Sequence, residues 1–167
     1  ESYTIGSVEQ TIGASIGIAL IPQDGTSPDE LLRLADLAMY EAKSSGRNCF
    51  CFFSPHMNHI AQLNAGIESD LRDALISDQL FLEYQPIVDT ASGNYVGLEA
   101  LLRWNHPVRG RLYPSDFIKV ANDSGLIGRI GSWVIEAVCK QIALFAEEGI
   151  ELPHIAINVS PKQFEYA

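Results

Sequence analysis

Charged side chains alternate with leucine in the stretch of sequence around residue 100. Glu99, Leu101 and Arg103 fall at every second position, so on a β-strand they project from the same side. Glu99 and Arg103 are about 13 Å apart along a strand that rises ~3.3 Å per residue, which is too far for a simple ion pair. The spacing therefore predicts that these two charges do not pair with each other.

This strand has two interpretations, and the pattern alone leaves both open. The strand can be amphipathic, with Glu99 and Arg103 facing solvent. Alternatively it is buried on both sides, because Leu101 separates the two charges and the alternate positions from Val96 to Trp104 are also apolar. A buried carboxylate then requires a cation, since leaving it bare costs on the order of several kcal/mol.

Asn158 is a second candidate, because it interrupts an apolar run at the end of the sequence. The simpler interpretation is an asparagine at a strand end that bonds to the backbone. The functional interpretation is an amide oxygen that binds a hard metal ion. Carboxylate and amide oxygens suit Mg²⁺ or Mn²⁺, whereas softer metals take histidine or cysteine. With no CxxC pair, the three cysteines are expected to be reduced thiols rather than zinc ligands.

The composition excludes some classes of partner. The formal net charge is −10, from 21 acidic and 11 basic side chains, which argues against a long nucleic-acid backbone but not against a small anion. Hydrophobic residues make up 47% of the chain, enough to form a core. No apolar run reaches the ~18 residues that cross a bilayer, and no signal-peptide pattern opens the sequence. We therefore expect a cytoplasmic location, with which a membrane anchor upstream of Glu1 is compatible.

The first part of the sequence carries alternating strand and helix signals. Residues 11–21 are apolar, small and partly β-branched, which predicts a buried strand. A helix is expected to begin after Ser27, which can form a capping box with Glu30. Gly46 offers a left-handed stop for this helix. A second short strand is expected over residues 49–53.

The rest of the sequence predicts an α/β arrangement. A helix with apolar residues at helical spacing follows a boundary near residues 54–58. The period then changes to two, and a turn-forming cluster between two strands predicts an antiparallel hairpin. Two helices and a further strand follow, so this strand is expected to lie parallel to a neighbour through a helical crossover. The predicted ranges are 80–88 and 95–104 for the hairpin, 115–122 and 126–148 for the helices, and 154–160 for the last strand.

Several separated motifs occur in an order that resembles the EAL phosphodiesterase family. They are residues 84–87, 99–104 and 158–160, and the segments 117–118 and 125–127 fit the same pattern. The resemblance covers roughly residues 60–167. It implies a modified (β/α)₈ TIM-type barrel with one antiparallel strand, of which this chain holds the first part. It also implies Mg²⁺- or Mn²⁺-dependent hydrolysis of cyclic di-GMP to linear pGpG.

The resemblance implies roles for individual residues. By position, Glu99 and Asn158 are catalytic and bind the metal ion, while Gln85, Leu101 and Arg103 contact the substrate. Arg103 is expected on a phosphate. These roles agree with the chemistry of the reaction, in which a metal-activated water attacks phosphorus in line and positive charge holds the nonbridging oxygens.

The sequence departs from the family at one position and ends before the family's pattern does. Asn122 stands where the family often has glutamate, a position with no assigned catalytic role. Further acidic ligands and the general-base region are expected beyond Ala167. We therefore expect this fragment to be inactive alone and the parent protein to be a cyclic di-GMP phosphodiesterase. A non-catalytic cyclic di-GMP receptor and a purely structural tandem are the alternatives.

Residues 35–48 resemble the closing helix and strand of a GGDEF diguanylate cyclase domain, within a match over roughly residues 1–53. The resemblance implies that Lys43 and Arg47 reach the phosphates of GTP. Alternatively, these two cations simply favour the helix dipole, by ~0.3–1 kcal/mol. The signature loop of that family is expected before Glu1, which leaves open whether a cyclase is active.

These observations predict two domains. Residues 1–55 are expected to form the α+β tail of a GGDEF domain, and residues 56–167 the N-terminal half of an EAL domain. The expected partners are cyclic di-GMP and, at the first domain, GTP. The parent protein is expected to be a homodimer.

Overall fold

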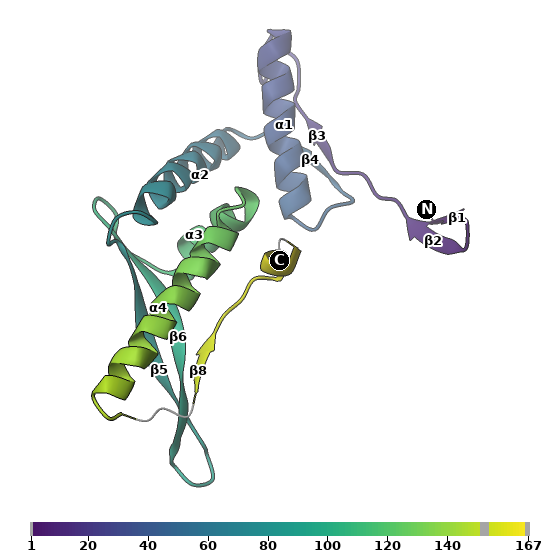
Figure 1. Cartoon of the computed structure of the whole chain (residues 1–167). Helices are drawn as coiled ribbons and strands as arrows, with labels where there is room; N and C mark the ends of the chain where they lie inside the picture. The colour runs from purple at the N-terminus through teal and green to yellow at the C-terminus, as the bar shows by residue number, and fades with distance from the viewer. Residues whose placement is uncertain (1, 151–153, 166–167) are drawn as a thin grey trace. The chain divides into compact units, whose positions relative to one another are not determined.

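The computed structural model describes residues 2–150 and 154–165 of the chain (Figure 1). The chain divides into two compact units, Glu1–Asn64 and Ala65–Ala167. Helix α2 (Pro55–Ala74) is continuous through the point where one unit ends and the other begins. The predicted domain boundary between residues 55 and 56 stays a prediction. In the part of the chain that the structure describes, no helix is both long and apolar enough to cross a membrane.

The first unit contains two small sheets, helix α1 and the first part of α2. Strands β1 (Ser2–Ile5) and β2 (Val8–Thr11) form an antiparallel hairpin. Strands β3 (Ile16–Ile18) and β4 (Phe50–Phe52) pair in parallel, and helix α1 (Pro28–Ser44) connects them. The strand–helix–strand order agrees with the prediction, because a parallel pair needs a long crossover.

Helix α1 packs through its small and apolar residues. Leu34, Ala38 and Ala42 are buried along one stripe of the helix, as their spacing predicts. On strand β3, an added Cβ at Gly17 would overlap the backbone carbonyl oxygen of Ala35. Gly17 therefore permits the close approach of the helix to the strand.

Two local predictions for the first unit were wrong. The strand expected over residues 11–21 is confined to β3, because residues 12–15 pair with no strand among the described residues. Ser27 is the N-cap of α1 but makes no side-chain capping hydrogen bond, so the reciprocal pair expected with Glu30 does not form. The Glu30 carboxylate lies beside Gly25 instead, where an added Cβ would meet it at 3.0 Å.

The second unit is built on a sheet centred on one long strand. Strand β6 (Tyr95–His106) pairs antiparallel with β5 (Leu80–Val88) and with the short β7 (Gly110–Leu112). It pairs in parallel with β8 (Ile155–Ile157). Helices α3 (Pro114–Asp123) and α4 (Ile127–Glu147) connect β7 to β8, and a 3₁₀ helix, η1 (Pro161–Glu165), follows β8. The hairpin, both helices and the parallel crossover are confirmed.

Strand lengths and the short third strand were not predicted correctly. The last strand covers Ile155–Ile157 rather than residues 154–160. Strand β7 was not predicted, because Gly110–Leu112 is too short to show an alternating pattern. Gly110 adopts φ 73° at the turn that leads into β7, a conformation that glycine adopts readily.

The core of the second unit lies on one face of the sheet. Ala100, Leu102 and Trp104 of β6 are buried against residues of α2, α3 and α4. The Trp104 ring meets Phe117 edge to face, with centroids 5.5 Å apart, and its indole nitrogen donates to Gln79 Oε1 at 3.0 Å. Figure 1 shows α4 running along this face of the sheet. The opposite face therefore carries the residues at odd positions of β6.

The turn between β5 and β6 is closed by Asp89. Its carboxylate accepts hydrogen bonds from the backbone of Ser92 at 2.7 Å, from the Ser92 hydroxyl and from the backbone of Ala91. The bonds from Ser92, backbone first, hold the pKa of the Asp89 carboxyl below its usual range. Gly93 follows with φ 72°. The turn therefore has the chemistry that its sequence predicts.

Candidate functional site

One face of the sheet gathers the polar side chains that the sequence singles out. The antiparallel register sets Gln85 of β5 opposite Glu99 of β6, and opposed residues share a face. The parallel register sets Ala156 of β8 against Glu99, so Asn158, two residues further on, returns to the same face. Arg103, four residues after Glu99, also lies there. The register therefore brings all four predicted polar site residues to the face opposite the core.

Glu99 and Asn158 are in direct contact although 59 residues separate them in the sequence. The Asn158 side-chain nitrogen donates to Glu99 Oε1 at 2.7 Å. Glu99 is half-buried and Asn158 is exposed. The predicted convergence of an acid and an amide from different strands is therefore present, and one small cation could contact both groups. Their roles as metal ligands and catalytic residues stay predictions.

The donor atoms of this pair fit a hard divalent ion. A carboxylate oxygen and an amide oxygen are ligands that Mg²⁺ and Mn²⁺ accept. The amide nitrogen of Asn158 now faces Glu99, and a half-turn of the amide would bring its oxygen to the same place. Within residues 2–150 and 154–165, no cluster of three or more His, Cys, Asp or Glu side chains could hold a metal. Glu99 and Asn158 are therefore the two candidate ligands among the described residues.

Arg103 pairs with Glu83 and not with Glu99, which agrees with the prediction that Glu99 and Arg103 do not pair. Its Nε donates to Glu83 Oε2 at 2.8 Å, and its Nη1 donates to the backbone oxygen of Leu102 at 2.8 Å. The guanidinium carbon lies 5.1 Å from the ring centroid of Tyr113, a cation–π arrangement. The side chain is 12% exposed, so these contacts hold a largely buried cation. Glu99 is not its partner.

A groove of about 480 Å³ runs beside Arg103 on the same face of the sheet. The residues that line it come from β5 and β6: Glu83, Tyr84, Gln85, Pro86, Leu101 and Arg103. Tyr84 is paired with Ala100 and its side chain packs against the core, where burial raises the pKa of its hydroxyl. Gln85, Leu101 and Arg103, the three predicted substrate contacts, therefore share one groove.

Glu83 joins the site without having been singled out from the sequence. It accepts from Arg103 with one carboxylate oxygen and from Arg111 of β7 with the other. These hydrogen bonds, that from Arg111 first, hold the pKa of the Glu83 carboxyl below its usual range. The sequence feature that could have identified Glu83 is its position two residues before Gln85, because this spacing places both side chains on one face of a strand.

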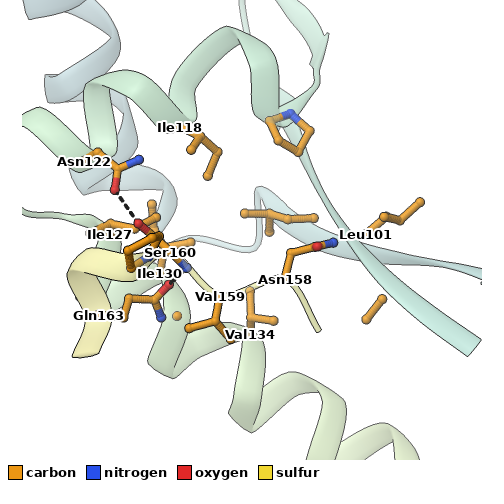
Figure 2. Close-up of a pocket in the computed structure, with 15 residues that line it drawn as sticks. Leu101, Ile118, Asn122, Ile127, Ile130, Val134, Asn158, Val159, Ser160 and Gln163 are labelled. Atoms are coloured by element: carbon orange, nitrogen blue, oxygen red, sulfur yellow. Dashed lines mark hydrogen bonds between the residues drawn. The ribbon is translucent and has the colours of Figure 1, made fainter. Parts of the chain in front are cut away.

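A second cavity, of about 410 Å³, lies between β6, α3, α4 and the segment after β8 (Figure 2). Figure 2 shows Leu101 and Asn158 at one side of this cavity and the pair formed by Asn122 and Ser160 at the other. The Ser160 hydroxyl donates to Asn122 Oδ1 at 2.8 Å, and Lys162 Nζ donates to the backbone oxygen of Asn122 at 2.8 Å. Asn122 is the position at which the sequence departs from the family pattern. Its hydrogen bonds link α3 to the segment that follows Asn158.

Lys43 and Arg47 lie at the end of α1 in the first unit, and both are exposed. Gly46 has φ 111°, which confirms the left-handed stop, and Arg47 continues with φ 62°. The Arg47 backbone nitrogen donates to the Ala42 oxygen at 3.1 Å. The contact of these two cations with GTP phosphates stays a prediction.

Two known families match parts of the chain. Residues 68–167 match the family described as "EAL domain", and residues 1–49 match "Diguanylate cyclase, GGDEF domain". The first match covers more than half of the 167 residues. The chain belongs to the EAL domain family, and it carries a GGDEF segment before the EAL segment.

Named relatives and a solved structure are similar over much of the chain. It is 46% identical over 167 residues to the bifunctional diguanylate cyclase/cyclic di-GMP phosphodiesterase MucR of Pseudomonas aeruginosa, and 44% identical over 161 residues, 96% of the chain, to the cyclic di-GMP phosphodiesterase PdeR of Escherichia coli. The chain spans 24% of the length of each relative.

The solved structure described as "PaMucR Phosphodiesterase, c-di-GMP complex" is 43% identical, with a TM-score of 0.57, over 61% of this chain and 41% of that chain. The predicted α/β class, the first part of a barrel-like EAL domain, is therefore confirmed.

Proposed function

We propose that this chain is part of a longer GGDEF–EAL protein whose EAL domain hydrolyses cyclic di-GMP to linear pGpG with Mg²⁺ or Mn²⁺. The observation that carries the proposal is the 2.7 Å contact between Asn158 and Glu99, on the face that also bears the groove. The printed functions of MucR and PdeR, and the cyclic di-GMP complex of the similar solved structure, support the same substrate.

Each of the described site residues would have a separate role in the reaction. Glu99 and Asn158 would hold the divalent ion, which when bound acts as a Lewis acid on phosphate and lowers the pKa of water. Arg103 would bind a nonbridging phosphate oxygen with the part of its guanidinium that faces the groove. Gln85 would offer its exposed amide to the ligand, and Leu101 an apolar surface to a base.

The test is Glu99→Gln in the full-length protein. The glutamine oxygen can still accept the hydrogen bond from Asn158, so folding should be unchanged, while the charged metal ligand is lost. We expect pGpG production in Mg²⁺, measured by chromatography, to fall by about a hundredfold or more, the scale of losing a metal-centred contribution.

Glu136→Gln is the matched control, because it removes an ionised and exposed glutamate from α4. Glu136 pairs with Lys140 at 2.7 Å, which lowers the pKa of the Glu136 carboxyl. This control should retain full turnover. Unchanged turnover in Glu99→Gln would contradict the proposed hydrolase.

A cyclic di-GMP receptor without catalysis is the second candidate. It is supported by the similar solved structure, which is described as a complex with cyclic di-GMP. Calorimetric titration of the full-length protein with cyclic di-GMP, first in Ca²⁺ and then in Mg²⁺, separates the two functions. Binding in both ions with hydrolysis in Mg²⁺ identifies the enzyme, and binding without hydrolysis identifies the receptor.

We also propose that the first unit takes GTP at Lys43 and Arg47, on the basis of its match to the GGDEF domain. Exchange of both residues to glutamine should remove GTP binding by the full-length protein in equilibrium dialysis. The homodimer and the cytoplasmic location stay predictions, which sedimentation and cell fractionation test.

A further inference from the structure

One carboxylate joins two guanidiniums at the edge of the groove. Glu83 Oε2 accepts from Arg103 Nε at 2.8 Å, and Glu83 Oε1 accepts from Arg111. The residues come from three different strands, β5, β6 and β7. The arrangement therefore depends on the sheet register and is not a local ion pair along one strand.

The contacts of Arg103 determine which of its hydrogens remain available. A guanidinium has five N–H donors in one plane. Nε is occupied by Glu83 and Nη1 donates to the Leu102 oxygen, while the Tyr113 ring covers one face at 5.1 Å. Among the hydrogen bonds of the described residues, none involves Nη2 of Arg103. These contacts fix the plane of the Arg103 guanidinium and leave its Nη2 hydrogens available to a ligand oxygen.

Arg111 holds the other side of the carboxylate. Its guanidinium carbon lies 5.5 Å from the Phe81 ring centroid and 5.6 Å from that of Tyr113. Tyr113 therefore contacts both guanidiniums, because Arg103 lies over the same ring. Glu83 thus has a partner on each oxygen, and both partners are restrained by aromatic rings.

The cluster is locally positive in an acidic chain. The formal net charge of the chain is −10, but two guanidiniums and one carboxylate sum to one positive charge. Hydrogen bonds from Arg111 and then Arg103 lower the pKa of Glu83, so its carboxylate is ionised at neutral pH. Glu83 orients the two cations without cancelling their attraction for an anion.

We propose that Glu83, held by Arg111, is a positioning residue that fixes the Arg103 guanidinium for a phosphate oxygen of a cyclic dinucleotide. This inference rests on the proposed function and adds the residues that set the affinity of the groove. Glu83 and Arg103 line the same groove as Gln85, so the positioned cation and the exposed amide face one ligand.

A competing electrostatic effect must be separated from positioning. Glu83 is itself an anion, and its removal would strengthen the attraction of the site for phosphate if net charge alone mattered. Glu83→Asp retains the charge but shortens the side chain by one methylene, so the carboxylate no longer reaches both guanidiniums. If Glu83 positions Arg103, both Glu83→Asp and Glu83→Gln bind the ligand more weakly. If net charge alone mattered, Glu83→Asp would bind as the unmodified protein does, and Glu83→Gln would bind more tightly.

The experiment measures cyclic di-GMP affinity of the full-length protein in Ca²⁺, and KM and kcat in Mg²⁺. We expect Glu83→Asp and Glu83→Gln each to raise the Kd and the KM by about five- to tenfold, the size of one modest charged contact, with kcat within about twofold. Glu136→Gln, on an exposed part of α4, should leave all three constants unchanged.

The possible results have distinct meanings. Wild-type affinity in Glu83→Asp, or tighter binding in Glu83→Gln, overturns the positioning role and leaves the proposed function intact. A loss of kcat with unchanged KM also overturns it, because a positioning contact for the ground-state phosphate acts on binding. No binding of cyclic di-GMP by the unmodified protein removes both the proposed function and this inference.

Discussion

His106 connects helix α2 to the turn between β6 and β7, and its replacement is the most informative test of the second unit. Its side chain is 4% exposed. Nδ1 accepts hydrogen bonds from the backbone nitrogens of Val108 at 3.0 Å and Arg109 at 3.1 Å. Nδ1 therefore carries no hydrogen, and Nε2 donates to Asp70 Oδ2 at 2.9 Å. The ring also lies 5.0 Å from the Trp104 indole.

The cost of His106→Ala follows from these contacts. Losing the acceptor for these two partly buried backbone hydrogen bonds costs about 1–3 kcal/mol. Losing the packed ring adds about 1–2 kcal/mol. We expect a total loss of about 2–5 kcal/mol in the free energy of unfolding. Asp70→Asn, which keeps an oxygen acceptor for Nε2, should cost about 1 kcal/mol.

Urea unfolding followed by tryptophan fluorescence measures this loss in the second unit alone. Both tryptophans of the chain, Trp104 and Trp133, lie in Ala65–Ala167, so the first unit does not contribute to the signal. With a slope of about 2 kcal/mol/M, His106→Ala should lower the unfolding midpoint by about 1–2.5 M. A midpoint within about 0.3 M of the unmodified chain would refute the reasoning, since it would mean that these backbone N–H groups need no protein acceptor.

Two further predictions concern the first unit and the arginine cluster. Gly17→Ala should destabilise the first unit by about 2–4 kcal/mol in thermal unfolding followed by circular dichroism, because the new Cβ would overlap the backbone oxygen of Ala35. Gly128→Ala, the control, places its new Cβ where no atom lies within 4 Å and should cost less than about 1 kcal/mol; equal losses would contradict the argument. The folded-state pKa of Glu83 is depressed, so the contribution of its ion pairs should be complete above its ordinary pKa of about 4.3 and be lost as the pH falls through the lower folded value. The Nε–H resonance of Arg103, followed by NMR, should therefore not change between pH 8 and about pH 5, and a transition within that range would exclude a depressed pKa.

Local periodicity was enough to predict most elements of the second unit. The alternation over β5 and β6 and the turn residues from Asp89 specified an antiparallel hairpin, because the side chains of a half-buried strand repeat every second residue. Helix spacing and the glycine at position 149, with φ 74°, likewise specified α4 and its end. The same local signals failed at residues 11–21, where apolar character alone does not provide a partner strand.

The sequence by itself also determined which residue types are offered to a ligand, since Glu99, Arg103 and Asn158 are the polar interruptions of apolar strands. Only the tertiary structure decided their partners. The parallel register of β8 brought Asn158 to Glu99, and the antiparallel register of β5 and β7 brought Glu83 and Arg111 to Arg103. These pairings join residues far apart in the chain, and a shift of one residue in either register would send the side chains to the opposite face. Local patterns specify which face a side chain takes within its own strand, whereas the residue that it meets there depends on the packing of the whole sheet.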